Sequence, residues 1–221
     1  ALIAMLVCAA FGTVTGFFIA YLNVPPFIAT LAMMEIVYGI GLIVTNATPL
    51  GGYVEQYTNV SNGKFLGINY LIWIAIIVAA ITWFIFNMTR HGKYMYAIGG
   101  NPQAAEVAGV PVKATLILIY MKAAAMYGLA GFMLGAKAGG ASVQTGYGYE
   151  MEAIAACTIG GVSVTGGRGK VSSAIIGVAV FELLKVALQY LGMNANAQYI
   201  AIGVVIFIAI SLDIRKYIAR K

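Results

Sequence analysis

The sequence predicts an all-α, polytopic transmembrane helical bundle, and three observations predict it. Hydrophobic residues make up 62% of the 221 residues and charged residues only 9%, and the mean hydropathy is +0.91. A soluble domain has about half apolar and a quarter charged residues, so a soluble fold is excluded. The apolar residues also come in runs of about 20, the length of a helix that crosses a bilayer. We expect one membrane domain over residues 1–221.

Six apolar runs are clear candidate spans, in the order Ala1 to Leu22, Pro26 to Ala47, Tyr70 to Asn87, Ala114 to Lys137, Val171 to Leu191 and Gln198 to Leu212. A seventh stretch, Met151 to Val164, is shorter. About 14 helical residues rise only about 21 Å, too little to cross the bilayer core alone. We therefore expect a broken or half-span helix there.

The start of the chain predicts that the domain is N-terminally incomplete. Ala1 lies inside an apolar run, with no Met and no basic leader before it. Such a start is typical neither of a signal peptide nor of a natural first residue. We expect a further N-terminal part to precede this sequence.

The basic residues predict the orientation of the spans. Lysines and arginines cluster at about 88–113 and after Asp213, which the positive-inside rule assigns to the cytoplasm, whereas the segment at about 48–69 is expected outside. An even number of crossings must separate the two cytoplasmic segments, and this requires the short helix to be a crossing. The same count places Arg168 and Lys170 toward the cytoplasm.

Composition also excludes several functions. The net charge of +6 lies beside the apolar runs, where lipid headgroups explain it better than nucleic acid does. Cys8 and Cys157 lie in apolar sequence without a second ligand nearby, so we interpret both as small buried residues. His91 is the only histidine and belongs to a basic loop. We predict no catalytic residue and no metal site.

Glycines recur at four-residue spacing inside two runs. These pairs are Gly12 with Gly16 and Gly131 with Gly135. Small residues at this spacing let two helix backbones approach closely. We interpret them as packing positions.

A short cytoplasmic helix is marked at both ends within the segment Gly99 to Pro111. Asn101 is suited to cap the first turn, Pro102 to open the helix, and Gly109 to end it. A helix of about seven residues is marginal in water by itself. We therefore expect it to dock, either on its own bundle or on a partner protein.

The glycine-rich stretch Gly160 to Lys170 ends in Gly-Lys, as a phosphate-binding loop does. Such a loop needs a glycine five residues before that pair and Ser or Thr directly after it, but the chain has Val164 and Val171 there. We expect no ATP binding by this chain. The glycines are interpreted as a break between the short helix and the next span.

The clear charged residues inside the runs are Glu35, Lys122, Glu182 and Lys185, and such residues usually face a bundle interior or a water-filled path. Glu182 and Lys185 are three residues apart and are suited to pair with each other. Glu35 and Lys122 have no partner nearby in sequence. We predict for them an inter-helix pair or a lining of a pathway.

Three segments carry a family resemblance: Tyr21 to Leu31, Gly99 to Pro111 and Glu152 to Ser163. They resemble the ribose/galactose-type permease subunits of bacterial ATP-binding-cassette (ABC) sugar importers, and within that family the galactose/methyl-galactoside members most of all. The resemblance covers nearly the whole chain. Full-length members extend beyond it at the N-terminus.

The resemblance implies that the short cytoplasmic helix is the coupling helix that contacts an ATPase subunit. The implied contact residues are Asn101, Pro102, Ala104, Ala105, Glu106, Ala108 and Gly109. The ATPase subunit uses the ATP, so this chain is not an enzyme and holds no cofactor. The implied partners are that ATPase, a second permease copy in a homodimer, a periplasmic sugar-binding protein and membrane lipid. The implied location is the bacterial inner membrane, with a cytoplasmic C-terminus.

A sugar offers hydroxyls and apolar ring faces, so its path should contain amides, hydroxyls and aromatic rings. Residues of this kind surround the Pro25-Pro26 break, and with the two unpartnered charges they form the candidate translocation path: Asn23, Phe27, Thr30, Glu35, Tyr38 and Lys122.

Two other functional classes remain as alternatives, besides an ABC permease for ribose or xylose. An ion-coupled secondary transporter should show inverted repeats and acidic residues at broken helices, and no clear repeat is visible here. An intramembrane enzyme would need a metal cluster or a nucleophile beside a base, and neither is recognisable in the sequence.

Overall fold

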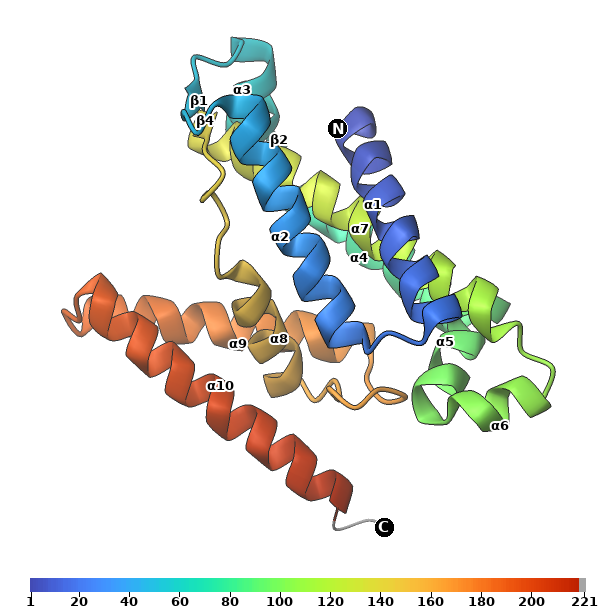
Figure 1. Cartoon of the computed structure of the whole chain (residues 1–221). Coiled ribbons are helices and arrows are strands. Elements are labelled where there is room, and N and C mark those ends of the chain that lie inside the picture. Colours follow the sequence, from blue (N-terminus) through green and yellow to red (C-terminus); the bar gives the residue numbers. More distant parts are fainter. Residues whose placement is uncertain (219–221) are drawn as a thin grey trace. The chain divides into compact units, whose positions relative to one another are not determined.

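The computed structural model describes residues 1–218, and the side chains of all of these except 195–196, 212–214 and 216–218. The basic residues at the very end of the chain lie outside this part. Over the described residues the chain is almost entirely helical, which confirms the predicted all-α class (Figure 1).

Five helices are long and apolar enough to cross a membrane, and each matches a predicted run within a few residues: α1 (Leu2–Leu22), α2 (Pro26–Thr45), α4 (Tyr70–Met88), α7 (Val112–Ala138) and α9 (Val171–Tyr190). The sixth predicted run lies in α10 (Ala195–Ile218), where Ala197–Ser211 is a shorter apolar helix among the searched residues. At 1.5 Å per residue all of α10 is about 36 Å long, enough for a bilayer core.

The remaining elements are short. They are α3 (Glu55–Asn62), α5 (Arg90–Gly100), α6 (Pro102–Val107) and α8 (Tyr149–Ile159), with the two-residue strands β1 (Leu50–Gly51), β2 (Lys64–Phe65), β3 (Ile68–Asn69) and β4 (Gly140–Ala141). The predicted short span is thus α8, and it ends five residues earlier than expected. It ends there because Gly161 adopts a φ of +85°, which turns the chain out of the helix.

Contacts divide the chain into two compact units, which are described separately. Unit 1 comprises residues 1–80 and 106–146, and unit 2 comprises residues 81–105 and those from 147 onward. The single permease domain expected from the sequence stays a prediction.

Unit 1 is built on the antiparallel pair α1 and α7 (Figure 1). A Cβ on Gly12 would collide with the carbonyl oxygen of Tyr120, and one on Gly16 would lie 2.8 Å from the Cα of Ile117. On α7, a Cβ on Gly128 would lie 2.6 Å from the carbonyl oxygen of Ala4. The predicted packing role of Gly12 and Gly16 is confirmed. Gly128 is a third such position, which the four-residue pattern did not include.

The other predicted glycine pair behaves differently. Gly135 is buried beside the Tyr57 hydroxyl, which would lie 2.8 Å from a Cβ there, whereas Gly131 has no neighbour within 4 Å among the described residues. The Tyr57 hydroxyl donates a 2.6 Å hydrogen bond to the carbonyl oxygen of Phe132. Burial, and secondarily the neighbouring Tyr53, raise the pKa of Tyr57, so its hydroxyl stays a donor at physiological pH.

Contacts at the two ends of unit 1 show which of its segments share a side. At one end β1 pairs with β4, so Leu50 lies opposite Ala141 and the segment 48–69 shares a side with the residues after α7. At the other end the Lys113 ammonium lies 5.1 Å from the centre of the Tyr21 ring. Which of these two sides faces the cytoplasm stays a prediction.

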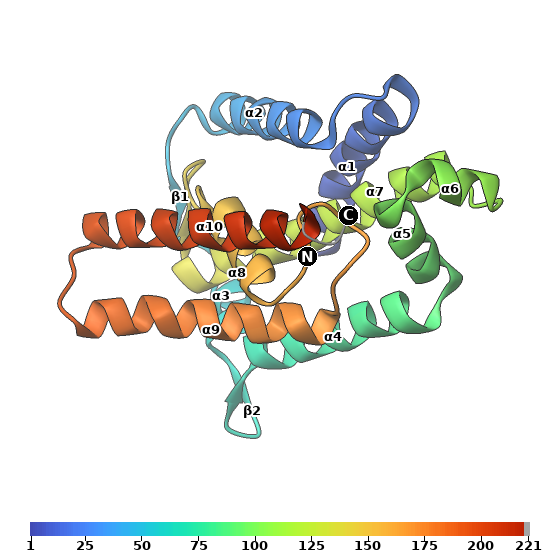
Figure 2. The same cartoon turned by 90° about the horizontal axis from the view of Figure 1, so that it is seen from below.

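In unit 2, α8 lies between α9 and α10 (Figure 2). The centre of this packing is a cluster of Ala155 and Ala156 from α8, Phe181 from α9 and Ile202 from α10. Two glycines bring the backbones of α8 and α9 together. A Cβ on Gly177 would collide with the carbonyl oxygen of Ala156, and one on Gly160 would collide with that of Ser173. The short helix is thus held by close backbone packing.

The α1–α7 packing predicts that Gly12→Ala destabilises the protein. The added methyl meets backbone of α7, which must move, and such overpacking costs roughly 1–3 kcal/mol. The matched control is Gly131→Ala, which makes the same change in open space on a helix and should be neutral or stabilising. Thermal unfolding of the full-length protein in detergent measures the stability of both variants. Equal midpoints for the two variants would contradict the packing role.

Candidate functional site

The helix α6 has the end signals that the sequence predicts. The Asn101 side-chain oxygen accepts a 3.0 Å hydrogen bond from the backbone N–H of Ala104, which caps the first turn. At the other end the N–H of Gly109 donates to the carbonyl oxygen of Glu106 at 3.0 Å, and Gly109 has a φ of +81°. The short helix with two marked ends is therefore confirmed as a structure.

Most of the residues assigned to the coupling contact are exposed, namely Asn101, Pro102, Ala104, Glu106, Ala108 and Gly109. Ala105 is the exception, because it is 4% exposed and packs within the chain. Val107, which the sequence analysis did not single out, is 91% exposed. Its exposed side chain follows Glu106 at the end of α6, and no signal in the sequence distinguishes it from other valines.

The candidate path residues fall mainly on one helix. Phe27, Thr30, Glu35 and Tyr38 lie within an arc of about 140° on α2, since each residue turns the helix by about 100°. Asn23 ends α1 in the left-handed conformation with a φ of +53°, which asparagine tolerates better than most residues.

These path residues lie at the surface of the described chain. No residue of α2 is buried, and Tyr38 is the half-buried member of the set. Thr30 donates its hydroxyl to the carbonyl oxygen of Phe27 at 3.0 Å, within its own helix. Glu35 and Lys122 are both exposed, and among the described residues neither belongs to an ion pair. The inter-helix pair predicted as one option for them is therefore not formed here.

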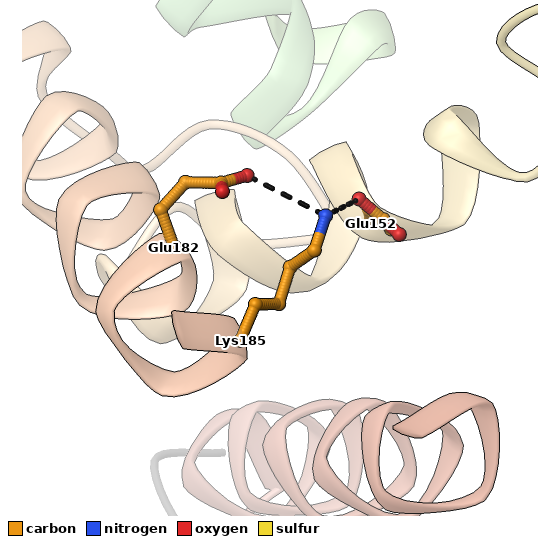
Figure 3. Close-up of polar contacts among 3 residues, drawn as sticks. All are labelled: Glu152, Glu182 and Lys185. Carbon is orange, nitrogen blue, oxygen red and sulfur yellow. Dashed lines mark hydrogen bonds and ion pairs between the residues drawn. The ribbon is translucent and has the colours of Figure 1, made fainter. Parts of the chain in front are cut away.

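Unit 2 contains an ion-paired cluster that sequence reasoning only half anticipated (Figure 3). The Lys185 Nζ lies 2.8 Å from a carboxylate oxygen of Glu152 on α8 and 3.7 Å from one of Glu182 on its own helix. The predicted Glu182–Lys185 pair is thus present, but Glu152 is the nearer partner. Glu152 was missed because it is 33 residues away and lies on the neighbouring helix.

The three side chains differ in exposure. Those of Lys185 and Glu152 are 21% and 20% exposed, whereas that of Glu182 is 59% exposed. The rings of Tyr149 and Phe181 also lie near the Lys185 ammonium, with centres at 5.9 Å and 6.0 Å. Lys185 therefore ties α8 to α9 by an ion pair with aromatic neighbours, and Glu182 adds one carboxylate at the surface.

Comparison with known proteins identifies the family. Residues 1–210 match the model of a family described as branched-chain amino acid transport system / permease component. The chain belongs to this permease family. Membership agrees with the apolar helices, and it confirms the resemblance to permeases drawn from the three sequence segments. It makes the chain a multi-pass inner-membrane transport permease and not a member of an enzyme family.

Curated relatives of the permease include sugar importers. This chain is 41% identical over 220 residues to the galactose/methyl galactoside import permease protein of Haemophilus influenzae. The aligned region covers 96% of this chain and 66% of the relative. For the protein of that name in Escherichia coli the identity is 40%, with 100% of this chain and 69% of the relative covered. The ribose import permease protein of Escherichia coli is 36% identical, with 94% and 66% covered. The chain thus spans about two thirds of the length of these relatives. No solved structure matches it.

The ion pair predicts that Lys185→Met destabilises the permease, because it leaves the Glu152 carboxylate without a partner. The expected loss is roughly 1–3 kcal/mol, below the roughly 3–5 kcal/mol of a fully buried pair, since both side chains keep some exposure. Adding Glu152→Gln to this variant should restore most of the lost stability. Glu182→Gln alone should change the stability little. Thermal unfolding in lipid nanodiscs measures the stability of each variant and so ranks them. A Glu182→Gln variant as unstable as Lys185→Met would contradict it.

Proposed function

We propose that the permease is the membrane-spanning subunit of an ABC importer that moves a monosaccharide across the inner membrane, with galactose or methyl galactoside as the preferred substrate. The observation that carries the proposal is the agreement between two independent features. Several relatives at about 40% identity are named as galactose/methyl galactoside import permeases. In addition, the chain presents a capped and exposed short helix of the kind that docks on a partner.

In this proposal α6 is the contact with a separate ATPase subunit that binds and hydrolyses the ATP. Its exposed surface combines one carboxylate, Glu106, with the apolar Val107 and small residues. A surface of this kind fits a shallow groove, because small side chains permit close approach and the two larger ones fix the register. The segment 88–113 and the C-terminus then lie in the cytoplasm, as the distribution of basic residues favours.

The sugar path is proposed along the exposed face of α2, from Asn23 past Phe27, Thr30 and Tyr38. An aromatic ring stacks on the apolar face of a sugar, while an amide and hydroxyls exchange hydrogen bonds with its hydroxyls. Glu35 and Lys122 complete the proposed lining. A face left open in one chain is suited to a second permease copy, and a periplasmic binding protein would deliver the sugar from outside.

Other substrates are distinguishable by competition. A ribose importer is among the relatives, and the family description names branched-chain amino acids. We expect excess unlabelled galactose to abolish uptake of labelled galactose, with weaker competition by ribose or xylose and none by leucine. ATP-dependent uptake of labelled leucine without uptake of labelled galactose would show that the substrate is an amino acid and not a sugar.

The coupling role of α6 predicts that Glu106→Lys and Val107→Asp in the full-length subunit abolish both co-purification of the ATPase and ATP-dependent galactose uptake. Both side chains are exposed, so the fold should persist, whereas Ala105 is buried and its substitution would test packing instead. Glu55→Lys, the same change of charge on the exposed surface of α3, is the matched control and should leave both unchanged. Uptake that persists without the ATPase and collapses with an ionophore would make the protein an ion-coupled transporter.

A further inference from the structure

The end of α5 packs directly on the backbone of the glycine-rich loop 160–170 (Figure 1). A Cβ on Gly99 would collide with the backbone nitrogen of Gly167. In the other direction, a Cβ on Gly166 would lie 2.9 Å from the carbonyl oxygen of Gly99, and one on Gly167 would lie 2.7 Å from the nitrogen of Gly100. Two backbones thus touch without any side chain between them.

The loop is shaped for this contact. Gly166, Gly167 and Gly169 have φ values of +93°, +71° and +141°, in the region where only glycine is free of steric strain. The N–H of Ser163 donates to the carbonyl oxygen of Arg168 at 3.1 Å and closes the loop on itself. Tyr96 of α5 adds a side-chain contact, because its hydroxyl donates to the carbonyl oxygen of Gly169 at 2.8 Å.

On one side of this contact lies the short helix α6. A single residue, Asn101, separates the end of α5 at Gly100 from the start of α6 at Pro102. The N–H of Asn101 donates to the carbonyl oxygen of Ala97 at 3.0 Å, and its side chain caps α6. A junction this short has little slack, so a displacement of α6 moves the end of α5.

On the other side lie α8 and α9, which the loop joins. Their backbones are in contact at Gly177, and a Cβ on Gly160 would collide with the carbonyl oxygen of Ser173. The ion pair of Glu152 with Lys185 holds them a second time (Figure 3). A displacement of the loop therefore acts on α8 and α9 as one body.

We infer that the backbone contact of Gly99 with Gly166 and Gly167 transmits the movement of α6 to the α8–α9 pair, with Tyr96 reinforcing it. These are positioning residues for the coupling of ATP hydrolysis to transport, and the inference rests on the proposed function. The physical reason is stiffness. Backbone packed on backbone has no rotatable side chain to absorb a displacement, and close-packed protein transmits strain.

The test compares Gly99→Ala with Gly100→Ala in the full-length subunit, reconstituted into liposomes with its ATPase and binding protein. Gly100 is the matched control, because it is the next residue of the same helix and a Cβ added there would meet no described atom within 4 Å. The readout is the amount of galactose taken up per ATP hydrolysed, measured beside co-purification of the ATPase and thermal stability.

We expect Gly99→Ala to retain the ATPase and hydrolyse ATP while the uptake per ATP falls by about fivefold or more, the usual size of an allosteric coupling. Gly100→Ala should match the wild type, and Tyr96→Phe should show a smaller fall. An unchanged ratio in Gly99→Ala overturns the inference. A loss of stability and of the ATPase in parallel with uptake also overturns it, since the contact is then merely structural.

If Gly99→Ala fails to fold, Tyr96→Phe decides, since it removes only a hydroxyl. A lowered ratio in that variant supports the inference, and a wild-type ratio overturns it. Failure of the proposed function is distinguishable, because then the wild type itself takes up no galactose with ATP. If the wild type takes up galactose normally and both variants keep its uptake per ATP, the inference is overturned while the proposed function stands.

Discussion

A helix of 11 residues is too short to cross a bilayer core, so α8 needs protein partners for its ends and its charges, and unit 2 depends on how it finds them. Lipid offers no hydrogen bonds, so irregular backbone is tolerated only where protein or water surrounds it. The 11-residue α8 packs against α9 and α10, its Glu152 is paired with Lys185, and the loop that follows rests on α5. Each of these contacts brings together segments distant in sequence.

The parts of the fold that sequence predicts are those determined over short distances. Twenty apolar residues have few alternatives to a spanning helix, so the predicted runs match the observed helices within a few residues. The helix α6 was also predictable, because its cap, proline and terminal glycine act within a few residues of it. In contrast, α3 and α5 are too polar to stand out from the loops that contain them, and both are positioned by distant contacts such as those of Tyr57 and Tyr96.

The candidate site was predictable to a similar degree. Sequence identified Glu182 and Lys185 as a pair, but the nearer carboxylate comes from another helix, and only packing specifies which residues of two helices face each other. The four-residue glycine pattern located Gly12 and Gly16, while the backbone contact of Gly99 with Gly167 follows no helical period. For the path residues on α2, the helix places them on one face, and what covers that face is not determined by this chain alone.

Glu182 is an exposed acidic residue within an apolar helix. Its side chain is 59% exposed at the twelfth position of the 20-residue apolar helix α9, and Lys185 beside it pairs more closely with Glu152. A charged side chain at such depth is unfavourable against lipid and is usually found facing protein or water. We therefore expect the face of α9 that carries Glu182 to meet a partner surface or an aqueous path in the assembled transporter.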